Sequence, residues 1–398
     1  MKIGGIVTEY NPFHKGHAYQ IRKIRELYGE DMGIVCVMSG DFVQRGEPAI
    51  YSKYARAEAA VRCGADLVLE LPVVYSTASA ERFASGAVEI LGRLGVVDYL
   101  FFGSESEDTE AIRKSAELLL TSAFHEKVKA ALETGCSYPT ARSMALQELN
   151  HGLDVTVNPN DNLGVEYVKA ILKYGYKMTP IAIQRVGGMH DTEYDGELKS
   201  GSEIRALIHS ASDVCEYVPE DAYAVYSREM NAGCGPVAAK DLETAILSRL
   251  RMLPYSFFEN LPDAAEGLEN RLYKACRTKT NLNEIYDAVK SKRYTHARIR
   301  RMVLHAALGI RKEDYKEDAL YVRVLALNER GGGILRASEE CRTIEVISKP
   351  SAARQLSQNQ ISLFEINADA HDLYVLAFAR ETARKGEQDW VASPIFVK

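Results

Sequence analysis

The first half of the chain alternates short apolar runs with amphipathic stretches, a rhythm that leaves few folds open. The apolar runs are nearly continuous, as is typical of strands covered on both faces, and they occupy residues 3–7, 34–38, 67–71, 99–102 and 179–183. The stretches between them, such as 53–63 and 80–94, predict helices. Together they predict an α/β fold with a doubly wound parallel sheet, which binds ligands at the carboxyl ends of its strands.

Residues 11–17, Asn-Pro-Phe-His-Lys-Gly-His, join the first expected strand to a helix-like segment. Gly16 would let the backbone approach a phosphate, and the helix start offers unpaired N–H groups to an anion. His14 and His17 would add imidazole donors where charge builds as an α-phosphorus is attacked. Two ordinary loop histidines are the alternative, but strand, spacing and helix all agree with a phosphate site.

Other segments are expected at the same edge of the sheet. Residues 38–48 form a polar loop after the second strand, where an acyl acceptor or donor would bind. Gly103 ends the 99–102 strand, and Arg185 ends the 179–183 strand, where an arginine can fork onto phosphate oxygens. Asn162 either caps the helix that follows it or turns its amide to a ligand.

Residues 200–205, Ser-Gly-Ser-Glu-Ile-Arg, place two hydroxyls at a helix start and Arg205 in its first turn. Alone, Ser202 reads as a plain N-cap. Paired with the histidine motif, the segment predicts a second anion site that faces the first.

Composition limits the class of protein. The chain has 398 residues, enough for two or three domains, with a net charge of −6, which argues against coating nucleic acid by bulk electrostatics. Its seven cysteines form no CxxC pair, so neither a metal site nor disulfides are indicated. Without a membrane-length apolar run or a signal peptide, a cytoplasmic protein with no membrane partner is expected.

The pattern of expected elements changes near residue 231, from alternating strands and helices to successive helices. A linker-like segment at 231–236 precedes four expected helices, at 241–253, 267–278, 282–290 and 295–308. Strand-like runs return near 319–327 and 342–347, around a glycine turn at 331–333. The expected division is a catalytic domain at 1–230 and a mostly helical domain at 231–398.

A basic run at 290–301 stands out in this acidic chain. Its candidate phosphate contacts are Lys292, Arg293, Arg298, Arg300 and Arg301. Tyr294 would stack on an unpaired base. The plainer alternative is a solvated helix face, since Ile299 and Val303 look core-facing.

The histidine motif and the late Ser-x-Ser-x-x-Arg helix start resemble the nucleotidyltransferase superfamily. The match narrows with residues 5–17, 38–48, 102–105 and 160–167, which are similar to the bacterial tRNA(Met) cytidine acetate ligase family. The resemblance covers most of the chain and is strongest before residue 210.

The resemblance implies a nucleotidyltransferase-like (Rossmann-like) fold and an ATP-dependent ligase. Such an enzyme activates acetate as acetyl-adenylate and then acetylates N4 of the wobble cytidine in elongator tRNA(Met). It implies catalytic roles for His14, His17 and Arg205, with Mg²⁺ accompanying ATP. The implied ATP-binding residues are Val7, Thr8, Glu9, Tyr10, Asn11, Pro12, Phe13, His14, Lys15, Gly16, His17, Ala18, Tyr19, Gln20, Gly103, Asn162 and Arg185, and the helix start at 200–205 adds Ser202 as a further candidate. Position 15 varies in the family, so Lys15 carries no required role.

Two other classes of function stay open at the level of sequence. A small-molecule adenylyl- or cytidylyltransferase explains the first half but leaves residues 236–398 without a purpose. A non-catalytic RNA-binding protein with a retained nucleotide pocket explains the basic run but not two intact phosphate motifs.

Overall fold

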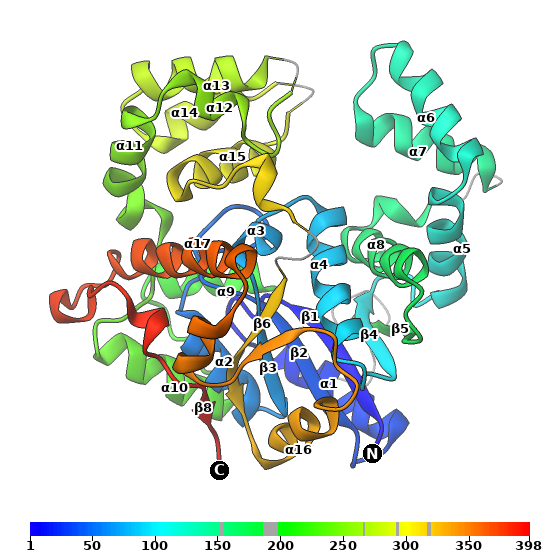
Figure 1. The fold of residues 1–398 in the computed structure, drawn as a ribbon, viewed down its shortest axis with the longest axis vertical. Coiled ribbons are helices and arrows are strands. Elements are labelled where there is room, and N and C mark those ends of the chain that lie inside the picture. The colour runs from blue at the N-terminus through cyan, green and yellow to red at the C-terminus, as the bar shows by residue number, and fades with distance from the viewer. Residues whose placement is uncertain (151–153, 186–197, 266, 292–293, 317–319) are drawn as a thin grey trace.

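A mixed eight-stranded sheet forms the centre of the computed structural model, which describes residues 1–150, 154–185, 198–265, 267–291, 294–316 and 320–398 (Figure 1). The strands are β1 (Ile3–Thr8), β2 (Gly33–Ser39), β3 (Leu67–Leu71), β4 (Tyr99–Ser104), β5 (Thr179–Gln184), β6 (Tyr321–Leu327), β7 (Glu345–Ile347) and β8 (Ile395–Phe396). They lie in the order β5-β4-β1-β2-β3-β6-β7, with β8 also paired to β6. β1 to β5 are parallel as predicted, whereas β6 runs antiparallel to β3.

Helices connect and cover these strands. The α-helices of the described residues are α1 (Lys15–Tyr28), α2 (Lys53–Arg62), α3 (Val73–Ser76), α4 (Ala80–Arg93), α5 (Thr109–Leu119), α6 (Ser122–Glu133), α7 (Tyr138–Leu149), α8 (Pro159–Tyr174), α9 (Gly201–His209), α10 (Glu220–Asn231), α11 (Glu243–Met252), α12 (Tyr255–Glu259), α13 (Leu268–Thr278), α14 (Leu282–Val289), α15 (His296–Leu308), α16 (Glu329–Ser338) and α17 (Gln358–Val375). Among the described residues, no helix has the length and hydrophobicity that a membrane span requires.

The side chains of β2 divide between two hydrophobic cores. Val35 and Val37 belong to the core under α4, α5 and α8, whereas Ile34 and Cys36 belong to the core under α1, α2 and α10. All four are fully buried. Successive residues of a strand point to opposite faces, so helices cover both faces and the doubly wound prediction is confirmed.

The chain after residue 231 is not one separate helical unit. Helices α11 to α15 form a lobe at the upper left of Figure 1, and their buried Leu250 and Met302 share the core on one face of the sheet. β6 then returns to the sheet and pairs with β3. The prediction of a helical region therefore fits the part of 231–398 that precedes β6, whereas β6 itself belongs to the central sheet.

The three glycines at 331–333 lie inside α16, so the predicted turn is wrong. The Asn328 side chain caps this helix by accepting a hydrogen bond from the Gly331 N–H at 2.9 Å. A Cβ on Gly331 would lie 2.0 Å from the Asp66 carbonyl oxygen. Glycine is thus required here for close packing of a helix on the residue that precedes β3.

Candidate active site

His14 and His17 cap the helix that follows β1. The His14 Nδ1 accepts a hydrogen bond from the Gly16 N–H at 3.1 Å, and the His14 N–H donates to the His17 Nδ1 at 3.2 Å. This reciprocal capping satisfies two N–H groups that a helix start leaves unpaired. A Cβ on Gly16 would lie 2.9 Å from the His14 ring, so this glycine makes room for the capping imidazole.

The same hydrogen bonds define which ring nitrogens carry protons. A nitrogen that accepts a hydrogen bond bears no hydrogen, so each neutral imidazole carries its proton on Nε2. Burial, with Arg185 and Arg205 nearby, lowers the pKa of His14 to about 4. Burial, followed by His14 and Arg185, lowers the pKa of His17 well below its ordinary value. Near pH 7 the stacked rings, 3.8 Å apart at their centroids, therefore present two neutral Nε2–H donors.

Arg205 reaches this motif from α9. Its Nη1 donates to the Asn11 carbonyl at 2.7 Å. A Cβ on Gly201 would lie 3.8 Å from the His14 Nε2 and 3.4 Å from the Arg205 Nη1. The first turn of α9 thus meets the histidines, and the structure brings together His14, His17 and Arg205 as predicted.

Ser200, and not Ser202, is the N-cap of α9. The Ser200 side chain accepts from the Glu203 N–H at 3.4 Å, and the Glu203 carboxylate accepts from the Ser200 N–H at 2.8 Å. Ser202 is exposed in the first turn of the helix. Its hydroxyl is therefore not used in the cap, and the plain N-cap reading of Ser202 is wrong.

Arg185 and Gly103 meet at the ends of two paired strands, β5 and β4. A Cβ on Gly103 would lie 3.0 Å from the Arg185 Cγ, so the arginine stem crosses the glycine. The Arg185 Nη1 donates to the Asn160 Oδ1 at 2.8 Å. Since the pKa of His14 is lowered partly by Arg185, this guanidinium belongs to the same site.

Asn162 does not cap a helix, because α8 begins at Pro159 with Asn158 in the N-cap position. The Asn162 Oδ1 instead accepts a hydrogen bond from the Arg142 Nη1 at 2.9 Å. The cap interpretation is therefore wrong, and the interpretation in which the amide turns to a ligand remains. Arg142 could not be predicted as a partner of Asn162, because it lies 20 residues away in the chain and belongs to no motif.

Several residues of the loop between β1 and α1, which carries the histidine motif, have buried side chains. Tyr10 and Phe13 are fully buried, and the Phe13 N–H donates to the Tyr226 hydroxyl at 2.9 Å. The Asn11 Oδ1 accepts from the Ile50 N–H at 2.8 Å. The side chains of Tyr10, Phe13 and Asn11 thus hold the loop between β1 and α1 in place.

A buried arginine ties the loop after β2 to the loop after β1. Arg56 is fully buried on α2 and donates to the carbonyls of Glu9 at 2.6 Å and of Ser39 at 3.1 Å. The Glu9 carboxylate in turn accepts from the Gln44 N–H at 2.9 Å. Burial raises the pKa of Glu9, against the effect of this hydrogen bond and of nearby arginines that include Arg205. The 38–48 loop is thereby placed beside the histidine motif, as the sequence predicted.

Buried charged side chains also hold the 38–48 loop and the start of α2 in place. Lys53 is fully buried, with its Nζ 2.8 Å from the Glu70 carboxylate and 2.5 Å from that of Asp389. The His371 Nδ1 lies 2.7 Å from the Asp41 Oδ2. Buried charges of this kind require partners, and the partners here come from β3, α17 and the C-terminal segment. Sequence patterning gave no signal for these pairings.

The predicted basic residues are partly engaged within the protein. Arg301 pairs with the Asp263 carboxylate at 3.2 Å, and Arg298 donates to the Asp263 carbonyl at 2.8 Å. Arg300 lies 2.6 Å from Glu47 in the 38–48 loop. Tyr294 is buried, which contradicts its predicted role as an exposed stacking platform. Lys292 and Arg293 lie outside the described residues.

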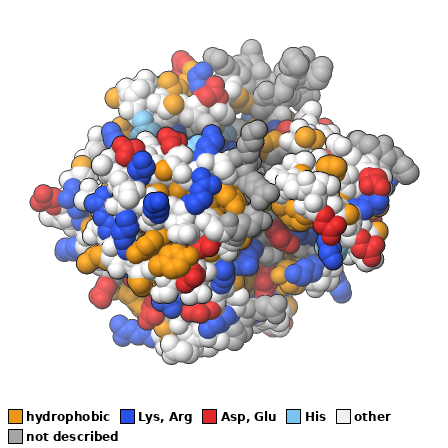
Figure 2. All heavy atoms as spheres, turned by 90° about the horizontal axis from the view of Figure 1, so that it is seen from above, with side chains coloured by type: hydrophobic (Ala, Val, Ile, Leu, Met, Phe, Trp, Pro, Cys, Tyr) orange, Lys and Arg blue, Asp and Glu red, His pale blue; other side chains and the backbone are white. Residues whose placement is uncertain are grey.

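The upper face of the molecule carries mixed charge. Figure 2 shows Lys and Arg side chains interspersed with Asp and Glu over the residues drawn in colour. Within that part of the chain they do not merge into one large basic field. Any RNA contact on this face would therefore rest on separate groups of basic residues.

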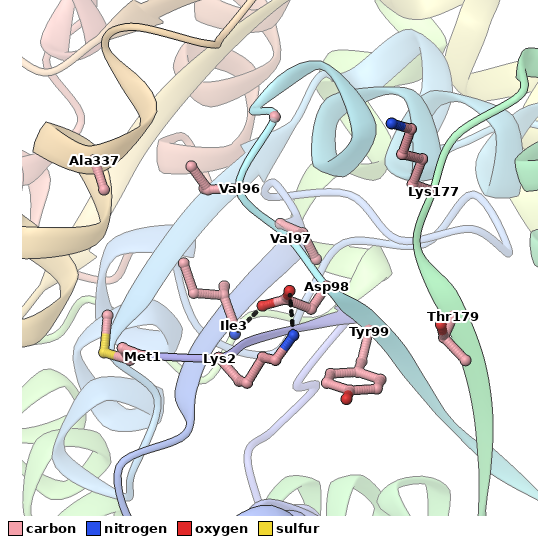
Figure 3. A pocket seen from close by; sticks show the side chains of 11 residues that line it. Met1, Lys2, Ile3, Val96, Val97, Asp98, Tyr99, Lys177, Thr179 and Ala337 are labelled. Atoms are coloured by element: carbon pink, nitrogen blue, oxygen red, sulfur yellow. Dashed lines mark hydrogen bonds and ion pairs between the residues drawn. The ribbon is translucent and has the colours of Figure 1, made fainter.

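A shallow cavity of about 580 Å³ lies at the opposite edge of the sheet (Figure 3). Its lining includes Lys2, Asp98 and Thr179, at the amino ends of β1, β4 and β5. The Lys2 Nζ donates to the Asp98 Oδ1 at 3.1 Å across it. Because parallel α/β sheets bind ligands at the carboxyl ends of strands, this cavity is not the candidate active site.

Comparisons with known proteins agree with this geometry. A family model described as HIGH Nucleotidyl Transferase matches residues 1–389. The tRNA(Met) cytidine acetate ligase of Thermosipho africanus is 37% identical, with both chains covered in full. That of Thermoanaerobacter sp. strain X514 is 38% identical over 95% of this chain and 96% of the relative. The crystal structure of Thermotoga maritima TmcAL bound with alpha-thio ATP is 34% identical, covers both chains fully and superposes with a TM-score of 0.91.

Proposed function

This chain belongs to the HIGH nucleotidyl transferase family and, within it, to the tRNA(Met) cytidine acetate ligases, and on that premise we propose that it uses ATP to acetylate a cytidine of tRNA(Met) with acetate. The observation that carries the proposal is the convergence of imidazole and guanidinium donors from His14, His17 and Arg205 at the start of α1. Such donors suit a phosphate whose charge shifts during displacement.

ATP would lie across the carboxyl ends of β1, β4 and β5. The structure of the Thermotoga maritima relative with alpha-thio ATP supports this choice of nucleotide. The proposed contacts are residues 7–20, Gly103, Asn162, Arg185 and Ser202. The first turn of α9 would add backbone N–H groups and its positive dipole end.

In the proposed first step, an acetate oxygen attacks the α-phosphorus of ATP in line with the bond to the β-phosphate. A new P–O bond forms, the α–β bridging bond breaks, and pyrophosphate leaves with the electron pair. His14, His17 and Arg205 would neutralise charge on the phosphate oxygens, so catalysis is mainly positioning and electrostatics. Acetyl-adenylate is the product.

We propose that ATP enters with Mg²⁺. The described residues contain no group of three or more side chains placed to hold a metal ion, which fits an ion carried mostly by phosphate oxygens. Mg²⁺ would neutralise phosphate charge alongside the arginines.

In the proposed second step, N4 of the wobble cytidine attacks the acetyl carbonyl carbon of acetyl-adenylate. The N–C bond forms, the bond from carbonyl carbon to phosphate oxygen breaks, AMP leaves, and the amine loses one proton. An anticodon base is already single-stranded, so it enters the site at lower cost than a base in a duplex. The 38–48 loop and the adjacent start of α15 are the proposed contact region for the tRNA.

The test is to incubate the protein with tRNA, ATP and acetate and to analyse the tRNA nucleosides by mass spectrometry. We expect N4-acetylcytidine that depends on both ATP and acetate and carries label from isotopic acetate. Formation of N4-acetylcytidine that needs no acetate and carries no label from it, or transfer of a nucleotide to a small acceptor in its place, would overturn the proposal.

A further inference from the structure

Arg142 lies on α7, outside the loops that carry the histidine motif, and contacts Asn162 on α8. We infer that Arg142 is a positioning residue that orients the Asn162 amide, so that the NH₂ group and not the oxygen faces the bound nucleotide. This inference rests on the proposed function, because it takes Asn162 to be a nucleotide contact.

The chemistry of the two side chains fixes the direction of the bond. A guanidinium group has only donors, so the Asn162 atom at 2.9 Å from the Arg142 Nη1 must be the amide oxygen. Oxygen and nitrogen of an amide lie on opposite sides, so the NH₂ group points away from α7. Within the described residues, that nitrogen makes no hydrogen bond of its own. It is therefore available as a donor.

Arg142 is itself held in place. Its Nη2 lies 2.8 Å from the Glu166 Oε1, and both side chains are largely buried. Glu166 also pairs with Lys169 at 2.5 Å, and Lys169 with Glu81 at 2.9 Å. Glu166 follows Asn162 by one helical turn, so Arg142 bridges two side chains on the same face of α8. A largely buried guanidinium held by one hydrogen bond and one ion pair has little freedom to move.

The consequence concerns how the nucleotide is recognised. With its oxygen turned to Arg142, Asn162 presents its NH₂ donors to an acceptor atom of the nucleotide, such as a ring nitrogen or a ribose oxygen. The neighbouring positive charge also polarises the amide and strengthens its N–H donors. Without Arg142, the amide can rotate and binding must fix it in one of two orientations.

The first experiment measures KM and kcat for ATP in acetate-dependent ATP–pyrophosphate exchange. We expect Arg142→Ala to raise KM for ATP on the order of three- to tenfold, because one more side chain must be ordered on binding, with kcat nearly unchanged. Arg142→Lys, which keeps a charged donor, should recover part of this loss. Arg113→Ala is the matched control, because Arg113 lies on α5 and, among the residues that the structure describes, its ion pair is with the exposed Glu117.

An unchanged KM in Arg142→Ala would overturn the inference. So would a fall in kcat with KM constant, because a positioning residue for the nucleotide does not touch the reacting atoms. Thermal unfolding of each variant identifies any loss of folded protein. If Arg142→Ala does not fold, Arg142→Lys tests the inference in its place. An unchanged KM for ATP with a lowered melting temperature in Arg142→Lys would show that the arginine is merely structural.

The second experiment tests the orientation directly. Asn162→Asp keeps an oxygen for Arg142 but removes the NH₂ donors, so it should weaken ATP binding as much as Asn162→Ala does. Adenosine serves as a second probe, because it has no phosphates for the new carboxylate to repel. Binding by Asn162→Asp at the wild-type level would overturn the inference. Wild-type binding by Asn162→Ala would instead count against the proposed nucleotide site, which separates the two failures.

Discussion

Arg300 Nη1 lies 2.6 Å from Glu47 Oε1, and this ion pair joins α15 to the loop after β2. About a third of each side chain is exposed, so the pair contributes little to stability. The backbones are also in close contact, because a Cβ on Gly46, which has a φ of 74°, would lie 2.6 Å from the Arg301 nitrogen. The basic helix is therefore seated directly on a loop of the candidate active site.

Replacing Arg298, Arg300 and Arg301 together by glutamine should weaken tRNA binding. Each lost phosphate contact should reduce the slope of log affinity against log salt concentration by about one unit. Filter binding at several salt concentrations measures this slope. Acetate-dependent release of pyrophosphate should persist if the first step runs without tRNA.

The contacts to Asp263 make folding the necessary control for these variants. Arg298 and Arg301 both bind Asp263, so circular dichroism must show that the triple variant keeps its helices. The single change Asp263→Asn breaks the same ion pair without removing a positive charge. If Asp263→Asn weakens tRNA binding as much as the triple variant, the arginines act through structure and not through phosphate contacts.

His14→Ala and His17→Ala should each abolish turnover while the protein stays folded. Loss of one preorganised donor costs roughly 3 kcal/mol or more of transition-state stabilisation, which is more than a hundredfold in kcat. Single-turnover formation of acetyl-adenylate measures the effect on the first step. Near-normal rates in either variant would show that the two imidazoles only cap α1.

The strands and the histidine site could be predicted because their signals are local. Continuous apolar runs predicted β1 to β5, and the spacing of His14 and His17 predicted their place at a helix start. The turn predicted at 331–333 was wrong because Gly331 is needed for close contact with the Asp66 carbonyl, which is distant in sequence, and not for a local turn. Likewise, the place of β6 beside β3 depends on long-range pairing that no local pattern encodes.

The charge state of His14 is a separate prediction. Because burial is the main cause of its lowered pKa, His14 should titrate near pH 4 in the protein without ligand. Nitrogen NMR of labelled histidine should show the Nε2–H tautomer at pH 7, and His14→Gln assigns the signal. Titration near the ordinary value of about 6.5 would contradict the buried, hydrogen-bonded geometry.

The supporting network could not be predicted, since its members are far apart in sequence. Asp41 and His371 lie 330 residues apart, and so do, approximately, Lys53 and Asp389. In sequence each is an ordinary charged residue, and only the fold reveals that all four are buried. The carboxylates of Asp41, Asp389 and Glu70 lie among the buried cations Lys53 and Arg323, and a protonated His371 adds a further positive charge beside Asp41.

The contact with Asp41 makes stability depend on pH through His371. Burial opposes its charge, but the Asp41 carboxylate outweighs burial and the pKa of His371 is raised. A raised pKa gives stability that is complete below the unfolded value of about 6.5 and is lost as pH rises through the folded value.

His371→Gln keeps a hydrogen-bond donor but not the charge, and should lower the free energy of unfolding on the order of 2 kcal/mol at pH 6. Urea unfolding at a series of pH values should show this difference shrinking as the pH rises, because the wild-type protein loses the same charge. A difference that stays constant from pH 6 to 10 would mean that His371 does not titrate in this range, and a difference that grows with pH would contradict the direction of the shift.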